Sequence, residues 1–264
     1  MNVLSIDIDF FVEPVAHSRP FGSVERLDAG EYAVDDEASV TQLLERCGLS
    51  PGARVPGVFI RHHHQAFDVL AIACASEQAT AVLTHVDAHS DLGMGDSGYV
   101  YLATELVHLT IDERRRPRRG DEQMNEANWL AFAVAAGLVS DVTFVPRTMP
   151  TALKHDLHPW HVSGAGDEIV VRRATKHEKD LISYGQRELL KTVPVVARAP
   201  LSIRDHHDFR ASAPPDLVIV CQSPQFTPAA ADRVLEQCQS RMAADPRFAL
   251  EAPVGWPIDA DRAG

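Results

Sequence analysis

The chain has 264 residues, of which 45% are hydrophobic, and its formal net charge is −12. This length and apolar content suffice for one α/β domain with a large core, and the negative charge argues against nucleic acid or an anionic membrane surface as the main partner. The four cysteines form no Cys-x-x-Cys pair, which is typical of a reducing compartment.

The start of the chain and its apolar runs predict a cytoplasmic location. The first twelve residues carry Asp7 and Asp9 within their apolar run and lack the basic start of a signal peptide. No apolar run in the sequence reaches the roughly 18 residues that a membrane-spanning helix needs. We therefore expect a cytoplasmic protein without a membrane span.

Strands and helices are expected to alternate along the chain. The residue patterns predict strands at 3–12, 57–61, in the apolar run leading into 83–92, and at 141–145, 168–172, 193–203 and 216–221. They predict helices at 38–49, from 66 onward, at 99–109, at 122–139 and from 231 to 242. Irregular segments are expected at 13–37, 93–98, 111–120, 222–228 and in the last dozen residues, whereas 177–191 fits a mobile loop better than a helix. The alternation predicts a mostly parallel sheet with helices on both faces.

The segment 83–92 carries the densest chemistry. An apolar run leads into Asp87, His89 and Asp91, which lie two residues apart. In an extended backbone such residues point the same way, so three metal-competent groups are expected to converge at the carboxyl end of a strand. A divalent cation is the simplest group that neutralises so many buried charges.

Two other segments supply the same residue types at the ends of expected strands. Asp7 and Asp9 lie two residues apart in the first strand, and the strand at 57–61 runs into three histidines at 62–64. Together with the central segment they provide four carboxylates and at least two imidazoles, which is more than one cation needs. A carboxylate-rich set with added nitrogen suits two manganese ions better than zinc. Two ions about 3.5–4 Å apart lower the pKa of a shared water, so hydrolysis at a guanidinium, amidine or amide carbon is expected.

Three further candidates have simpler interpretations. The Asp-His-His-Asp run at 205–208 is typical of a polar turn, although it offers ligands. Cys221 ends a strand without a base placed beside it, so a buried structural thiol is favoured. His85 lies inside the central strand and is expected to hydrogen-bond to a metal ligand rather than to bind metal itself.

The metal-competent motifs resemble a known superfamily. The Asp-Ala-His-x-Asp pattern at 87–91 and the Ser-x-Asp-x-Asp pattern at 5–9 resemble the two signatures of the arginase and ureohydrolase superfamily. Here the second pattern opens the chain instead of following the first. This order, with a late Ser-Pro-x-Phe-Thr-Pro turn at 223–228, is similar to a divergent branch that includes peptide arginases of ribosomally made, modified peptides.

The resemblance implies a fold, a ligand set and a cofactor. It implies a single arginase/deacetylase-like catalytic domain over residues 1–264, with two manganese ions bridged by Asp87 and Asp7. One ion would add Asp91 and His63, or its neighbour His64; the other would add Asp9 and His89. Catalytic roles are implied for Asp7, Asp87 and His89.

The expected activity is conversion of arginine side chains in a precursor peptide to ornithine, with release of urea. The negative charge favours such a cationic partner, and the segments 13–37, 93–98 and 111–121 are expected to form its groove. Two alternatives stay open. One is a ureohydrolase or amide hydrolase acting on a free small molecule, such as arginine, agmatine or an acylated amine. The other is a metal-loaded binding protein without catalysis.

Overall fold

Eight strands form one sheet in the order β10-β4-β9-β1-β5-β6-β8-β7, and every neighbouring pair is parallel except β7 and β8. The computed structural model describes residues 1–17, 19–93, 97–148, 162–163 and 166–248. The strands, in chain order, are β1 (Asn2–Asp7), β4 (Val55–Ile60), β5 (Ala81–Asp87), β6 (Val139–Pro146), β7 (Glu168–Arg172), β8 (Val195–Ile203), β9 (Leu217–Cys221) and β10 (Met242–Ala244). A separate antiparallel pair joins β2 (Val12–Glu13) and β3 (Ala33–Val34).

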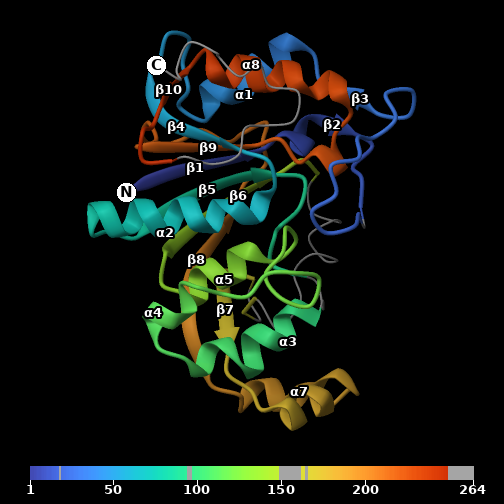
Figure 1. Ribbon diagram of the computed structural model, residues 1–264, viewed down its shortest axis with the longest axis vertical. Coiled ribbons are helices and arrows are strands. Elements are labelled where there is room, and N and C mark those ends of the chain that lie inside the picture. Colours follow the sequence, from blue (N-terminus) through green and yellow to red (C-terminus); the bar gives the residue numbers. More distant parts are fainter. Residues whose placement is uncertain (18, 94–96, 149–161, 164–165, 249–264) are drawn as a thin grey trace, which may run out of the picture.

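Helices cover both faces of the sheet, as the alternating pattern predicted (Figure 1). Helices α1 (Glu37–Arg46) and α8 (Asp232–Gln239) lie together on one face, and α2 (Ala66–Glu77), α3 (Ser97–Thr104) and α5 (Trp129–Ala135) pack on the other. The short helix α4 (Ile111–Arg114) and α7 (Lys176–Ser183) lie toward the β7 end of the molecule (Figure 1). Among the described residues, no helix is both long and apolar enough to cross a membrane.

Alternate residues of the central strands face two different hydrophobic clusters. In β1, Val3 belongs to the cluster under α2 and α5, whereas Leu4 and Ile6 belong to the cluster under α1 and α8. In β5, Leu83 faces the first cluster and Val86 the second. These strands are therefore buried on both faces, as is usual for parallel sheets, and the face under α2 and α5 is the one that also carries Ser5, His85 and their neighbours.

The expected element bounds are wrong at several places. The predicted strand 3–12 ends at Asp7, because a 3-10 turn follows at Ile8–Phe11. The predicted helix 122–139 is helical only from Trp129 to Ala135, and residue 139 already belongs to β6. Residues 177–191 were expected to be a loop, but they contain most of α7 and a 3-10 helix at Arg187–Lys191.

Other bounds differ in smaller ways. Met242 was expected on a helix and lies in the edge strand β10. Part of the basic segment 111–120 is helical, in α4. The predicted loop 93–98 includes residues 94–96, which lie outside the described residues. The last dozen residues, which were expected to be irregular, also lie outside them. The predicted class, α/β with a mostly parallel sheet, is confirmed.

Close contact between the edge strand and β4 makes Gly57 sensitive to added bulk. A Cβ atom at Gly57 would lie 2.3 Å from Cε of Met242 and 2.9 Å from the backbone oxygen of Val218. We expect Gly57→Ala to lower the free energy of unfolding by about 1–3 kcal/mol, measured by urea denaturation. The control is Gly30→Ala, whose Cβ would meet only the side-chain oxygen of Asp28 at 3.3 Å and should change stability by less than about 0.5 kcal/mol. Equal losses in both variants would contradict this close packing.

Candidate metal centre

Four adjacent parallel strands deliver the candidate ligands to one edge of the sheet. In the order β4-β9-β1-β5, the register pairs Ile60 with Cys221, Cys221 with Asp7, and Ile6 with Val86, so the carboxyl ends of these strands lie level. The segments that follow them supply the histidines after β4, a serine turn after β9 and the Asp-rich motifs after β1 and β5. Residues distant in sequence therefore meet at this edge.

The Asp-x-Asp motif at 7–9 and the Asp-x-His motif at 87–89 contain the same local hydrogen bond. Oδ1 of Asp7 accepts a hydrogen bond from the backbone N–H of Asp9 at 3.0 Å, and Oδ1 of Asp87 accepts one from that of His89 at 2.7 Å. Such a side-chain turn ends the strand and directs the second residue of each motif into a new position. The expectation that 87–91 stays extended is therefore wrong; β5 ends at Asp87, and Asp91 has a positive φ of 51°.

His63 is the point where three carboxylates converge. Its Nδ1 lies 3.1 Å from Oδ2 of Asp7, 2.9 Å from Oδ2 of Asp87 and 2.9 Å from Oδ2 of Asp91. Its other ring nitrogen, Nε2, lies 2.9 Å from Oγ of Ser5. This contact fixes the ring with Nδ1 toward the carboxylates, as a partner behind a metal-binding histidine does.

A second group forms beside the first and shares a carboxylate with it. Nδ1 of His89 lies 2.9 Å from Oδ2 of Asp9 and 3.7 Å from Oδ1 of Asp87. Donor atoms of Asp9, Asp87 and His89 all lie within 4.8 Å of one another, and so do those of His63, His85 and Asp87. Asp87 belongs to both groups, so the described residues offer two neighbouring positions for cations.

The buried charges perturb one another strongly. Burial, together with the carboxylates of Asp7 and Asp87, raises the pKa of Asp9 well above its ordinary value. Burial and the charge of Asp87 raise the pKa of Asp91 to about 7. Burial alone lowers the pKa of His63, but the charge of Asp91 and the contacts with Asp7 and Asp87 outweigh it and raise that pKa well above its ordinary value. Without a cation, this site therefore retains protons at neutral pH.

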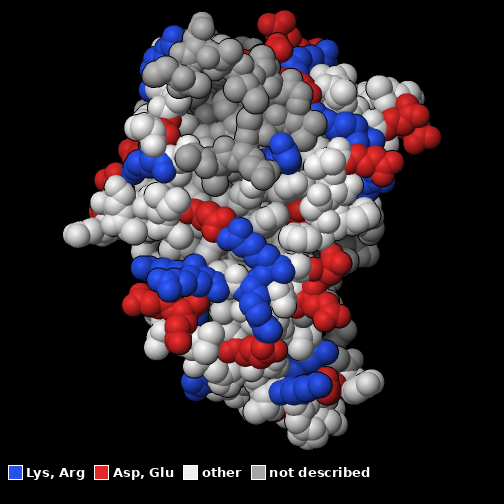
Figure 2. All heavy atoms as spheres, viewed as in Figure 1, with Lys and Arg blue, Asp and Glu red and all other residues white. Residues whose placement is uncertain are grey.

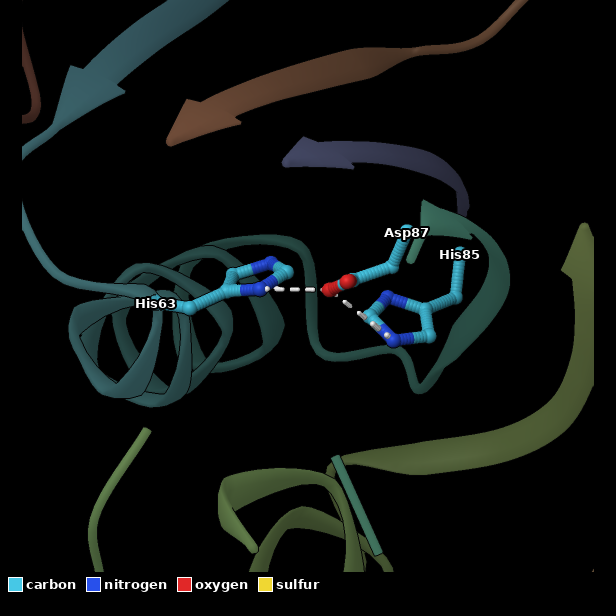
Figure 3. Close-up of side chains that lie close together, drawn as sticks. All are labelled: His63, His85 and Asp87. Atoms are coloured by element: carbon cyan, nitrogen blue, oxygen red, sulfur yellow. Dashed lines mark ion pairs between the residues drawn. The ribbon is translucent and has the colours of Figure 1, made fainter. Parts of the chain in front are cut away.

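The donor set fits a metal because two of its central atoms are buried without a hydrogen bond. These are Nδ1 of His63 and Oδ2 of Asp87, which lie 2.9 Å apart; Figure 3 shows their ion pair. Buried polar atoms are normally paired, and a divalent cation between imidazole nitrogens and carboxylate oxygens would satisfy these. Residues His63, Asp7, Asp9, Asp87, His89 and Asp91 would hold the two ions.

Two positioning contacts were not predicted from the sequence. Trp129, at the start of α5, donates its indole N–H to Oδ2 of Asp91 at 2.5 Å. Ser223, whose φ of 43° is left-handed, donates its hydroxyl to Oδ2 of Asp7 at 2.5 Å. The late Ser-Pro turn pointed to this segment but not to that hydrogen bond, and nothing in the sequence links Trp129 with Asp91.

His62 and His64, the neighbours of His63, contact Glu126 rather than the aspartates of the two His/Asp groups. Nδ1 of His62 and Nδ1 of His64 each lie 3.4 Å from Oε1 of Glu126, and the two rings stack with centroids 5.9 Å apart. Of the two alternatives left open by the sequence, His63 is therefore the one that faces the aspartates. Glu126 also accepts a hydrogen bond from the backbone N–H of Gly22 at 3.1 Å, which ties the 13–37 segment to the site.

The weaker sequence candidates lie elsewhere or play other roles. Asp205, His206 and His207 form a turn directly after β8, and their donor atoms also lie within 4.8 Å of one another, apart from the main site. Cys221 is a buried free thiol whose Sγ lies 3.2 Å from Oγ of Ser223, and burial raises its pKa well above the ordinary value. It therefore behaves as the structural thiol that was expected.

The fold and the site define an α/β protein with a buried His/Asp cluster suited to metal ions. Comparison of the chain with protein-family models and with curated proteins found no match. Membership of the arginase and ureohydrolase superfamily therefore stays a prediction that depends on the motifs.

Metal binding should release protons from this site. The pKa of Asp91 is about 7 and that of His63 is raised well above its ordinary value, so the metal-free protein keeps protons at pH 7, and a cation must displace them. We expect Mn²⁺ affinity to rise between pH 6 and pH 8, with release of about one proton or more per chain. Calorimetric titration in buffers of different ionisation enthalpy measures this release.

The same shifts fix the sign of the stability change. Groups with a raised pKa stabilise the metal-free fold at low pH. Asp91 loses this contribution between its ordinary pKa of 3.8 and about 7, and His63 loses it as the pH rises above its ordinary pKa of 6.5. Thermal melts of chelator-treated protein should therefore show falling stability from pH 6 to pH 8, and added Mn²⁺ should restore it. A binding enthalpy that does not depend on the buffer would contradict this account.

Proposed function

We propose that this protein is a binuclear, manganese-dependent hydrolase that converts arginine side chains of a precursor peptide to ornithine and releases urea. The observation that carries the proposal is the position of Asp87, whose carboxylate belongs to both His/Asp groups. Carboxylate-rich sites with some imidazole suit manganese. The peptide substrate rests on the resemblance of the motifs at 5–9 and 87–91 to those of peptide arginases.

The chain's own groups have distinct tasks in this proposal. Two divalent ions, when bound, would activate water for attack on the guanidinium carbon and offset the negative charge that develops there. Ser5, Trp129 and Ser223 hold His63, Asp91 and Asp7 in fixed orientations. The four aspartates are at most 5% exposed, and their burial strengthens the interaction of the carboxylates with cations.

Substrate would reach the site from the side of His89. The side chain of His89 is 21% exposed, whereas those of His63 and Asp87 are 2% and 1% exposed. Nε2 of His89 lies 2.9 Å from the backbone oxygen of Ala16 and 3.3 Å from Nδ1 of the exposed His17. The 13–37 segment therefore borders the accessible side, and it would form one wall of the peptide groove.

The charge of the chain as a whole favours a cationic substrate. The net charge is −12, yet on the face seen in Figure 2 basic and acidic side chains alternate without forming one large acidic area. Two bound divalent ions would balance the charge of the four buried aspartates, so attraction for a cationic peptide would come from the net charge of the chain.

The test is turnover of arginine by manganese-loaded protein. An arginine-containing precursor peptide should yield ornithine and urea in equal amounts. The variant Asp87→Asn should lower kcat/KM by at least about 100-fold. Loss of a residue that only hydrogen-bonds a metal ligand costs about 10- to 100-fold, and loss of a ligand should cost more. The variant should fold, because the side-chain oxygen of asparagine can still accept the backbone N–H of His89 that shapes the turn after β5. Asp205→Asn, in the separate turn after β8, is the matched control and should retain activity.

Other outcomes decide between the alternatives. Turnover of free arginine or agmatine in preference to the peptide would replace the peptide arginase with a small-molecule hydrolase. Tight peptide binding without product, from protein shown to contain two ions per chain, would instead indicate a binding protein. Absence of bound metal after purification without chelator and after incubation with Mn²⁺ would remove the basis of the proposal.

A further inference from the structure

His85 belongs to the buried His/Asp cluster but lies outside the ligand motifs. It lies in β5 two residues before Asp87, so both side chains leave the same face of the strand, and its side chain is 0% exposed. Its Nε2 lies 3.5 Å from Oδ2 of Asp87 and 3.9 Å from Oδ2 of Asp91. Figure 3 shows Asp87 between His63 and His85, with dashed lines from one carboxylate to both rings.

These distances do not describe the hydrogen bond to a metal ligand that the sequence predicted. A hydrogen bond from a ring nitrogen to a carboxylate oxygen is about 2.7–3.2 Å long, and the distances from Nε2 of His85 to Asp87 and Asp91 are longer than this. The separation does match that of two ligands around one ion. Donors about 2.1 Å from a cation lie about 3–4 Å apart at the usual coordination angles.

The packing around His85 holds its ring in place. The ring stacks on Phe144 of β6, with centroids 5.4 Å apart, and meets the edge of Trp129 at 5.8 Å. It lies 5.3 Å from the ring of His63. An aromatic side chain of similar size would fill this space equally well, so packing alone does not require the nitrogens of histidine here.

We propose that Nε2 of His85 is a direct ligand of the inner cation, the one held by His63 and Asp87. The inference rests on the metal centre of the proposed function. The inner cation then has two imidazole ligands, whereas the outer one, beside Asp9, has only His89. The two positions therefore differ in ligand type, and the inner one binds later first-row ions such as Co²⁺ more tightly relative to Mn²⁺ than the outer one does.

The test compares ion binding by the full chain and by a His85→Phe variant, which retains an aromatic ring against Phe144 and Trp129. Chelator-treated protein is titrated with Mn²⁺ and, separately, with Co²⁺, and the visible Co²⁺ spectrum is recorded. The wild type should bind two ions per chain. The variant should lose about 10-fold or more in affinity for one of them, lose more for Co²⁺ than for Mn²⁺, and show a changed Co²⁺ spectrum.

A matched control and a structural measurement keep the result unambiguous. His108→Gln removes an exposed imidazole remote from the cluster and should change neither affinity nor spectrum. If His85→Phe does not fold, a crystal structure of the Co²⁺-loaded wild type decides: a distance from Nε2 to the ion of about 2.0–2.3 Å supports the proposal, and one beyond 3 Å overturns it. An unchanged Co²⁺ spectrum in a folded variant also overturns it.

The outcomes separate this inference from the proposed function. Suppose that the wild type binds two ions, that His85→Phe changes the affinity and the Co²⁺ spectrum as expected, and that arginine is not hydrolysed. His85 would then still be a ligand, and the proposed hydrolase activity would be wrong. If arginine is hydrolysed but the Co²⁺ spectrum of the variant is unchanged, the hydrolase proposal stands and His85 is not a ligand. A wild-type chain that binds no ion would overturn both.

Discussion

The structure depends on how one edge of the sheet accommodates four buried aspartates. Charged carboxylates in a dry environment repel one another and lose hydration, so each needs donors or a cation nearby. The chain meets part of this need locally, because Oδ1 of Asp7 and Oδ1 of Asp87 each accept a backbone N–H two residues on. The other oxygen of each side chain, Oδ2, is left pointing toward His63. Asp7 and Asp87 therefore each stabilise a turn with Oδ1 and face His63 with Oδ2.

Topology explains why such a site can be built from distant segments. β1 lies between β5 and β9, so the first strand of the chain is flanked by strands that begin at residues 81 and 217. Level carboxyl ends then bring their following turns within reach of one another. The start of α2 adds the histidine turn, and the start of α5 adds the indole of Trp129, which hydrogen-bonds Asp91. Helix ends and strand ends together surround the site.

Sequence reasoning identified the ligand candidates because their spacing reflects backbone geometry. Asp7, Asp9, Asp87, His89 and Asp91 each stand at or just after the end of an apolar run, and the structure brings them together. The reason given for the spacing was wrong, since the motifs turn instead of staying extended. Turn and strand produce the same two-residue spacing, so the sequence could not distinguish them.

Other features depend on tertiary contacts that leave no local pattern. Residues 122–128 have helical composition, but Oδ1 of Asn128 accepts the backbone N–H of Asn125, and its side-chain amide donates to the carbonyl of Gln123. These bonds replace helical ones and delay the helix until Trp129. Met242 continues the apolar stripe of α8, yet pairing with β4 makes it part of a strand. In both places a contact formed only in the folded chain outweighs local propensity.

The two His/Asp groups differ in burial, which is what the proposed hydrolase would need. The inner group lies beneath α2 and α5, in contact with the hydrophobic cluster that contains Trp129 and Phe144. The outer group borders the 13–37 segment through His89. In the proposal, an ion in the inner group would be confined by the fold, whereas one in the outer group would meet a substrate without any rearrangement of the core. Asp87 belongs to both groups, so a change in charge at the accessible position would act on the buried one through a shared carboxylate.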